Sequence, residues 1–291
     1  MSEAKSPDPR VRQAALHWQS QAVLLALLPL TAVWVTLEAG QMWYARDARL
    51  WIGATLCLLL AALVFSTRAA TAGAALTGAV IAGAFWLQTP GLHTALWPLM
   101  ALLVMTFAAT RFGRRRKEAL GIAEARRGRT ASQVAANLGI AALAGIPLSV
   151  AHVYTPVAFG GRAAMAAMVA ALAEATADTV SSELGQVLGG TPRMITTLRR
   201  VPPGTDGGVS LAGTLAGVAG AAMLVLVAKT ALPLLSWRDA GVGLAGGIAG
   251  TVVDSLLGAG PERRGWLNND AVNALSTLAA ALLAAQAVGW V

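Results

Sequence analysis

The chain has 291 residues, of which 56% are hydrophobic and only 12% are charged. Soluble domains carry about 25% charged residues, so this composition excludes an ordinary soluble protein and predicts an integral membrane protein. The net charge of +8 does not indicate a nucleic-acid partner, because the Lys and Arg residues cluster in short loops between apolar runs, where they specify membrane topology. The single cysteine, Cys57, has no partner within the chain for a disulfide.

Hydropathy predicts an all-α fold, a polytopic transmembrane helical bundle of about nine spans. We expect the spans at residues 22–38, 49–65, 69–87, 92–112, 131–153, 159–178, 209–226, 240–257 and 271–288. A cytoplasmic N-terminus puts most of the 22 Lys and Arg residues on the cytoplasmic side, as the positive-inside rule requires. We therefore expect the protein in the lipid bilayer of a bacterial inner (plasma) membrane.

Polarity divides the chain into three regions. Residues 1–21 are interpreted as a cytoplasmic leader, residues 22–65 as N-terminal scaffold spans, and residues 66–291 as the membrane domain that carries the polar clusters. In the third span, Gly73, Gly78 and Gly83 predict close helix packing, because small residues let neighbouring helix backbones approach.

The sixth span ends in a strongly polar stretch. Glu174, Asp178 and Ser182 stand four residues apart, with Glu183 beside them, so they share one helical face. Ionisable side chains in a membrane segment face a polar cavity and indicate a functional site. The predicted topology brings the polar ends of the fifth to ninth spans to the cytoplasmic surface. We therefore expect one site that faces the cytoplasm.

Four acids lie at three different helix ends: Asp178, Glu183, Asp206 and Asp254. Carboxylates that are brought together repel one another unless a cation lies among them, and oxygen ligands without His or Cys suit Mg²⁺ rather than zinc. The alternative is that each acid pairs with a loop arginine or caps a helix. We interpret the four acids as catalytic residues and metal ligands.

A glycine-rich segment, PPGTDGG at residues 202–208, precedes the seventh span. Backbone N–H groups of such a segment beside a helix N-terminus favour an anion such as phosphate, although the same sequence also forms ordinary turns. The candidate cofactor-binding residues in this segment are Gly204, Thr205, Gly207 and Gly208.

Further polar residues lie at the start of the fifth and ninth spans. Arg129 suits a phosphate, and the amides Gln133 and Asn137 can orient a nucleotide or an acceptor. Asn269 and Asn273 form a second amide pair with a spacing of four, in which Asn269 can instead be a helix N-cap. Ser182 is expected to be another ligand in the same site.

These residues favour transfer of a phosphoryl or nucleotidyl group to a lipid head group, because such chemistry needs mainly positioning and charge neutralisation. A phosphate monoester acceptor is already ionised at neutral pH and needs no strong general base. Other functions stay open. The protein could be a lipid alcohol kinase or a CDP-lipid cytidylyltransferase, or a transporter or flippase of a phosphorylated lipid.

Five segments resemble, in order, one integral-membrane family: RRGRTASQVAANLG (126–139), ADTVSSELG (177–185), VPPGTDGGVSLAGTLAG (201–217), GTVVDSLLGA (250–259) and NNDAVNALST (268–277). This family contains the plant phytyl-phosphate kinase of vitamin E biosynthesis and many uncharacterised bacterial, archaeal and animal relatives. The chain has Gly260, Pro261 and Glu262 where the family pattern has a Thr-Leu-Gln-like run. We expect the loop before Asn268 to bind a different head group.

The resemblance implies that residues 66–291 are the catalytic membrane domain of the family. Together with the four acids, it predicts a membrane-embedded, Mg²⁺-dependent kinase that acts on a lipid phosphate. Its donor would be a nucleoside triphosphate, with CTP favoured, and its acceptor an isoprenoid monophosphate such as phytyl or geranylgeranyl phosphate. The four acids, the loop of residues 204–208 and Asn273 fall within the family motifs. The role of each residue is our inference from its chemistry.

Overall fold

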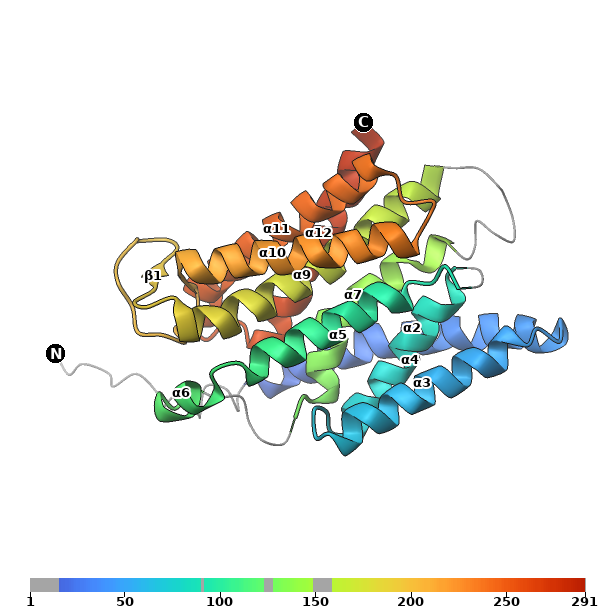
Figure 1. Cartoon of the computed structure of the whole chain (residues 1–291), viewed down its shortest axis with the longest axis horizontal. Helices are drawn as coiled ribbons and strands as arrows, with labels where there is room; N and C mark the ends of the chain where they lie inside the picture. Colours follow the sequence, from blue (N-terminus) through green and yellow to red (C-terminus); the bar gives the residue numbers. More distant parts are fainter. Residues whose placement is uncertain (1–15, 90–91, 123–127, 149–158, 291) are drawn as a thin grey trace.

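The computed structural model describes residues 16–89, 92–122, 128–148 and 159–290, and it confirms the all-α fold class, with one short pair of strands beside the helices (Figure 1). The longer helices are α2 (His17–Tyr44), α3 (Arg49–Ser66), α4 (Ala72–Leu87), α5 (Leu96–Arg111), α7 (Ala131–Ala144), α9 (Phe159–Leu188), α10 (Leu211–Ala231), α11 (Trp237–Leu257) and α12 (Asn269–Trp290). The shorter elements are α6 (Arg114–Ala119), the π-helix η1 (Gly258–Glu262) and an antiparallel hairpin of β1 (Arg193–Met194) and β2 (Gly208–Val209).

Seven helices in the described parts of the chain are long and apolar enough to cross a membrane. Helices α4 and α5 are also apolar but have 16 residues each. The seven long helices and these two shorter ones lie at the positions of the segments expected from hydropathy. The exact number of membrane spans and their orientation stay predictions. Most of the expected leader (1–15), residues 126–127 and the end of the fifth expected span (149–153) lie outside the described residues.

Helix α9 is the centre of the bundle. It contacts α5, α7, α10, α11 and α12, and Met168, Val169 and Leu172 in its middle are fully buried. Figure 1 shows α2 to α4 on one side of the bundle and α10 to α12 on the other. The sixth span was expected to end at residue 178, but α9 continues to Leu188, because no proline interrupts this polar stretch. The whole polar face therefore lies on one continuous helix.

Glycines on α10 and α11 allow these helices to approach α9 closely. A Cβ atom at Gly217 would lie 2.8 Å from the carbonyl oxygen of Ala177, and one at Gly247 would lie 3.0 Å from the backbone nitrogen of Glu174. A Cβ atom at Gly250 would lie 2.7 Å from Cγ of Glu174. Larger residues at these positions would force the helices apart.

The expectation of close packing at the third-span glycines is wrong. A Cβ atom at Gly78 would meet nothing within 4 Å. Added Cβ atoms at Gly73 and Gly83 would be in ordinary van der Waals contact, at 3.7 and 3.6 Å. Tight backbone contact depends on the neighbouring helix as well as on glycine, and an added Cβ atom at these three positions of α4 meets no backbone atom of another element within 4 Å.

The start of α12 is held by Asn268. Its Oδ1 accepts a hydrogen bond from the backbone nitrogen of Ala271 (2.9 Å), so Asn268 caps the helix and Asn269 is the first helical residue. The interpretation of Asn269 as the N-cap is therefore wrong by one residue. The Asn268 side chain also donates to the carbonyl oxygen of Leu16 (2.9 Å), which ties α12 to the beginning of α2.

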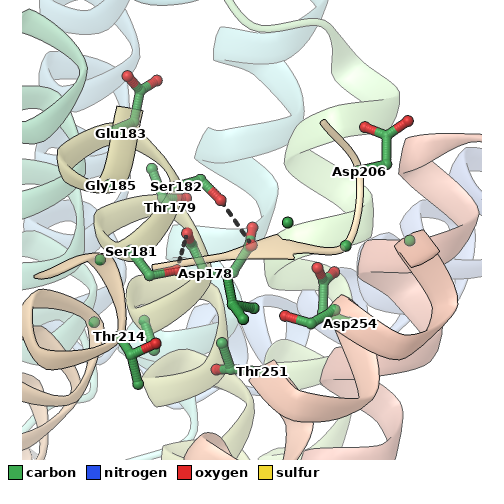
Figure 2. Close-up of a pocket in the computed structure, with 18 of the residues that line it drawn as sticks. Asp178, Thr179, Ser181, Ser182, Glu183, Gly185, Asp206, Thr214, Thr251 and Asp254 are labelled. Carbon is green, nitrogen blue, oxygen red and sulfur yellow. Dashed lines mark hydrogen bonds between the residues drawn. The ribbon is translucent and has the colours of Figure 1, made fainter. Parts of the chain in front are cut away.

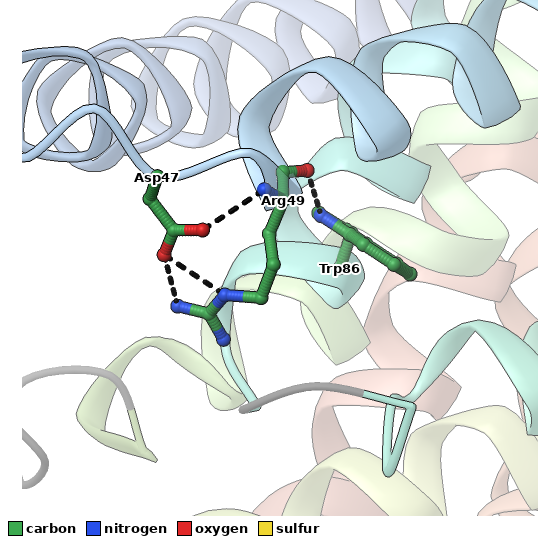
Figure 3. A network of polar contacts seen from close by, with 3 residues as sticks. All are labelled: Asp47, Arg49 and Trp86. Carbon is green, nitrogen blue, oxygen red and sulfur yellow. Dashed lines mark hydrogen bonds and ion pairs between the residues drawn. The ribbon is translucent and has the colours of Figure 1, made fainter.

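The turn between α2 and α3 lies at the end of the bundle far from the hairpin (Figure 1). Figure 3 shows that Asp47 accepts hydrogen bonds from the backbone nitrogen and Nε of Arg49, both at 2.9 Å. The Nε1 of Trp86 donates to the carbonyl oxygen of Arg49 (2.9 Å). These contacts fix the turn to α4. The guanidinium of Arg49 lowers the pKa of the half-buried Asp47 carboxyl below its usual value.

The close contact between α9 and α11 predicts a stability difference between two glycines of α11. We expect Gly247→Ala to lower the free energy of unfolding by about 1–3 kcal/mol, because the added methyl group overpacks against the α9 backbone. Gly241→Ala should not destabilise, because a Cβ atom there meets nothing within 4 Å. Unfolding in mixed detergent micelles measures both changes. Equal stability of the two variants would contradict the packing argument.

Candidate functional site

One cavity lies where the hairpin region, residues 193–209, meets the ends of α9 and α11. It encloses about 510 Å³, and α7, α9, α10, α11, α12 and the loop before β2 contribute to its wall. The structure brings every residue of the predicted site to this wall: Arg129, Gln133, Asn137, Asp178, Ser182, Glu183, Gly204, Thr205, Asp206, Gly207, Gly208, Asp254, Asn269 and Asn273. The roles of these residues stay predictions.

Asp178 of α9 and Asp254 of α11 form the carboxylate pair of the cavity. They lie beside each other in Figure 2 and are close enough to interact through their charges. Ser182 donates a long hydrogen bond to Oδ1 of Asp178 (3.5 Å), and Ser276 of α12 donates one to Oδ2 of Asp254 (3.4 Å). Because these hydrogen bonds are at the weak limit, both carboxylates retain acceptor capacity for a cation.

Glu174 lies one helical turn deeper than Asp178. Its side chain is buried, and its Oε1 atom has no hydrogen-bond partner among the described residues. It interacts electrostatically with both Asp178 and Asp254. An unpartnered buried carboxylate oxygen needs a proton or a cation nearby. The sequence places Glu174 on the same helical face as Asp178, and this spacing was a signal for it, but the predicted site does not include Glu174.

Glu183 has a different partner from the other acids. Its carboxylate forms an ion pair with Lys117 of α6, and in Figure 2 it points away from Asp178 and Asp254. Lys117 is buried, and its Nζ also donates to the carbonyl oxygens of Ala109 (3.1 Å) and Thr110 (2.9 Å). All three ammonium protons therefore have acceptors. The predicted site does not include Lys117, because this residue lies in a basic run that membrane topology explains by itself.

The glycine-rich loop is a compact turn and does not run directly into a helix. Val209 of β2 and Ser210, the N-cap of α10, separate the loop from that helix, which begins at Leu211. The helix therefore starts two residues later than expected, and Ser210 and Gly213 line the same cavity as the loop. Gly204 and Gly207 have positive φ values of 79° and 72°, and a Cβ atom at Gly207 would lie 2.4 Å from the backbone nitrogen of Ala259. This contact requires glycine. It holds the loop against η1.

The π-helix η1 carries an acid that sequence analysis did not include in the site. Glu262 lines the cavity and interacts electrostatically with Asp206 and Asp254. The only sequence signal for Glu262 was the departure from the family pattern at residues 260–262. Single π-helical turns such as η1 are frequent at functional sites.

Partial burial raises the pKa of Asp206 above its usual value, and the nearby Arg263 offsets part of this effect.

The α7 side of the cavity combines a cation with amides. The charge of Arg129 is close enough to interact with Asp178. Gln133 completes a capping box, in which its Oε1 accepts from the backbone nitrogen of Thr130 (2.8 Å). Nδ2 of Asn137 donates to the carbonyl oxygen of Gln133 (2.8 Å). Both amides therefore help to hold α7 while they also line the cavity.

The donor set fits magnesium in its chemistry. In the described ranges, no three side chains of His, Cys, Asp or Glu are grouped closely enough to hold a metal ion by themselves. Magnesium, however, is usually bound by one or two carboxylates together with water and substrate phosphates. Asp178 and Asp254 provide such a pair, whereas Glu183 is held by Lys117.

Comparisons with known proteins identify the family of the chain. A family model described as "Integral membrane protein DUF92" matches residues 55–281. The chain belongs to the DUF92 family. This result confirms the family that the five motifs indicated, and the match begins within α3, earlier than the expected boundary at residue 66. No solved structure matches the chain.

Three relatives illustrate the range of the DUF92 family. Uncharacterized membrane protein MJ0933 of Methanocaldococcus jannaschii is 43% identical over 128 residues, which cover 43% of this chain and 52% of that protein. Uncharacterized membrane protein sll0875 of Synechocystis is 33% identical over 187 residues (64% and 70%). The chloroplastic protein VTE6 of Arabidopsis thaliana is 33% identical over 184 residues (60% and 53%). The chain thus spans about half the length of the archaeal and plant relatives.

The ion pair of Lys117 makes a stability prediction for this DUF92 protein. We expect Lys117→Met to lower the free energy of unfolding by about 3 kcal/mol or more, because Glu183 and two carbonyl groups lose their donor. The matched change in the same helix, Arg114→Met, removes an exposed pair with Glu118 and should cost about 0.5 kcal/mol or less. Detergent unfolding measures both. Similar effects would mean that the buried pair does not hold α6.

The raised pKa of Asp206 predicts a pH-dependent effect of Asp206→Asn. The folded protein favours the protonated carboxyl, so wild-type stability falls as pH rises through the raised pKa. The variant should therefore gain stability relative to wild type towards neutral pH, and this gain should vanish at acidic pH. Asp47→Asn should show the opposite sign, because the pKa of Asp47 is lowered. Thermal unfolding at several pH values tests both, and a gain for Asp206→Asn that grows towards acid would contradict the assignment.

Proposed function

We propose that this DUF92 protein is a prenyl-phosphate kinase. It transfers the terminal phosphoryl group of a nucleoside triphosphate to an isoprenoid monophosphate and forms the diphosphate. The observation that carries the proposal is that residues from all five family motifs line one cavity at one end of the bundle. The similarity to the plant relative VTE6 and the resemblance to the phytyl-phosphate kinase family support the same activity.

The reaction is an in-line displacement at phosphorus. An oxygen of the acceptor monophosphate forms a bond to the γ-phosphorus, and the bond between that phosphorus and the β–γ bridging oxygen breaks. The nucleoside diphosphate leaves with the electron pair. The monophosphate has a second pKa near about 6, so its attacking oxygen is ionised at neutral pH. This property suits a cavity whose described lining contains no histidine to act as a base.

The chain's own residues bind and orient the two phosphates. Asp178 and Asp254 are the residues that would hold Mg²⁺, which when bound neutralises charge on the nucleotide phosphates. Arg129 and the loop of residues 204–208 bind phosphate oxygens. The remaining polar groups of the wall orient the nucleotide and the acceptor, and they are Gln133, Asn137, Ser182, Asn269 and Asn273.

The proposed donor is CTP, and the proposed location is the cytoplasmic face of a bacterial inner membrane. Basic residues mark this end of the bundle, where α6 reads RRRKEA and the hairpin region contains Arg193, Arg199 and Arg200. Figure 1 shows α6 and the hairpin at the same end. The positive-inside rule assigns such an end to the cytoplasm, where nucleoside triphosphates are available.

The purified protein tests the proposal with Mg²⁺, a panel of nucleoside triphosphates and geranylgeranyl monophosphate. Mass spectrometry of the lipids should show the gain of one phosphate, and EDTA should abolish it. A CDP-lipid with released pyrophosphate would instead identify a cytidylyltransferase. Phosphorylation of geranylgeraniol but not of its monophosphate would identify a lipid alcohol kinase. Lipid flux in proteoliposomes without nucleotide consumption would identify a transporter.

Asp178→Asn should lower kcat by at least about 100-fold, because it removes a preorganised charge where the nucleotide phosphates are bound. The matched control is Asp47→Asn, since Asp47 lies in the turn at the far end of the bundle and does not line the cavity. Its turnover should equal that of wild type. Retained turnover of folded Asp178→Asn would exclude the assigned role.

A further inference from the structure

A second cavity lies beside the candidate site, among α3, α4, α5 and α7. It encloses about 610 Å³, which is within the range of roughly 300–1,000 Å³ found for small-molecule sites. Leu60, Ala79, Leu103 and Val134 illustrate its apolar wall. On α5 the lining runs from Leu99 towards the end of the helix, a rise of about 17 Å. We call this cavity the apolar groove.

The apolar groove meets the candidate site at α7. Arg129 and Asn137 line both cavities. The position of Arg129 is fixed by its backbone, because its nitrogen donates to the carbonyl oxygen of Ala69 and its carbonyl oxygen accepts from the nitrogen of Thr71, both at 3.0 Å. A Cβ atom at Gly128 would lie 2.6 Å from the carbonyl oxygen of Arg68. The junction therefore depends on a close contact between two chain segments.

Basic side chains mark the end of the groove that is nearest to this junction. Arg68 follows α3, Arg111 ends α5, Arg114 begins α6 and Arg129 precedes α7. The guanidinium of Arg111 lies over the Phe107 ring, 4.1 Å from its centroid. A ligand that fits this distribution has an anionic head at the arginines and an apolar chain along the groove.

We propose that the apolar groove binds the isoprenoid chain of the acceptor monophosphate and places its phosphate at Arg129, beside Asp178. The inference rests on the proposed function, since it assigns a second part of the same substrate. Two observations favour this occupant over a bilayer lipid with no role in turnover. The groove shares two residues with the polar cavity, and one of them, Arg129, belongs to the charged end of the groove.

Gly78 provides a direct test of the groove. It lines the groove on α4, about 10 Å along the helix axis from Thr71, the N-cap of that helix. A Cβ atom there meets nothing within 4 Å, so a larger side chain at this position starts in open space on the wall of the groove. Gly40 of α2 is the matched control, because it also has no neighbour within 4 Å and does not line the groove.

Turnover should depend on chain length in the variant. We expect Gly78→Phe to lower kcat/KM for geranylgeranyl monophosphate at least about tenfold, because the ring occupies space that the distal chain needs. The five-carbon dimethylallyl monophosphate should be affected less than about twofold, since its chain ends before Gly78. Gly40→Phe should change neither value. The groove assignment would be overturned if the ratio of kcat/KM for the long acceptor to that for the short acceptor were the same in Gly78→Phe as in Gly40→Phe.

A binding readout on wild-type protein separates this inference from the proposed function. Geranylgeranyl monophosphate with a diazirine in its last isoprene unit should label peptides of α4 and α5 after irradiation. An excess of unmodified geranylgeranyl monophosphate should suppress the labelling, and phosphatidylglycerol should not. Labelling without any turnover would support the groove and exclude the kinase. Turnover without labelling of these helices, or labelling that phosphatidylglycerol suppresses equally, would exclude the groove as the acceptor site.

Discussion

The burial of carboxylates within an apolar bundle is the constraint on which the rest of this structure depends. Glu174 and Asp178 lie on α9, the helix with the most extensive packing, and Glu174 is almost inaccessible. Charged groups are costly in such surroundings unless they are paired or face a polar cavity. Glycines on α10 and α11 bring neighbouring helices close enough to form that cavity. Close packing around α9 and the polar cavity are therefore parts of one arrangement.

Two cavities with opposite chemistry meet at one helix. The polar cavity is rich in carboxylates and backbone groups, whereas the groove is apolar except near its arginines. Arg129 and Asn137 belong to both, and backbone hydrogen bonds between Arg129 and the start of α4 hold this junction in place. A lipid phosphate has the same division between an anionic head and an apolar chain. The arrangement accounts for how a membrane-embedded protein could present such a molecule to a water-soluble nucleotide.

Residues of the family motifs serve the fold as well as the cavity. Glu183 is bound by Lys117, Gln133 completes the capping box of α7, and the hydroxyl of Thr205 donates to the carbonyl oxygen of Pro202 (2.7 Å). Presence in a motif therefore does not assign a residue to chemistry. The acids that keep acceptor capacity, Asp178 and Asp254, are the stronger candidates for binding a cation.

The sequence by itself determined the helical membrane fold, the family and the set of polar residues that gather at one end, because hydropathy and spacing along a helix are local properties. It also placed Glu174 and Asp178 on one face. Only the tertiary structure decided which groups become partners. Lys117 with Glu183, Glu262 in η1 and the open space at Gly78 depend on segments far apart in the chain. The local sequence pattern does not predict these contacts, because each of them depends on the positions of several helices at once.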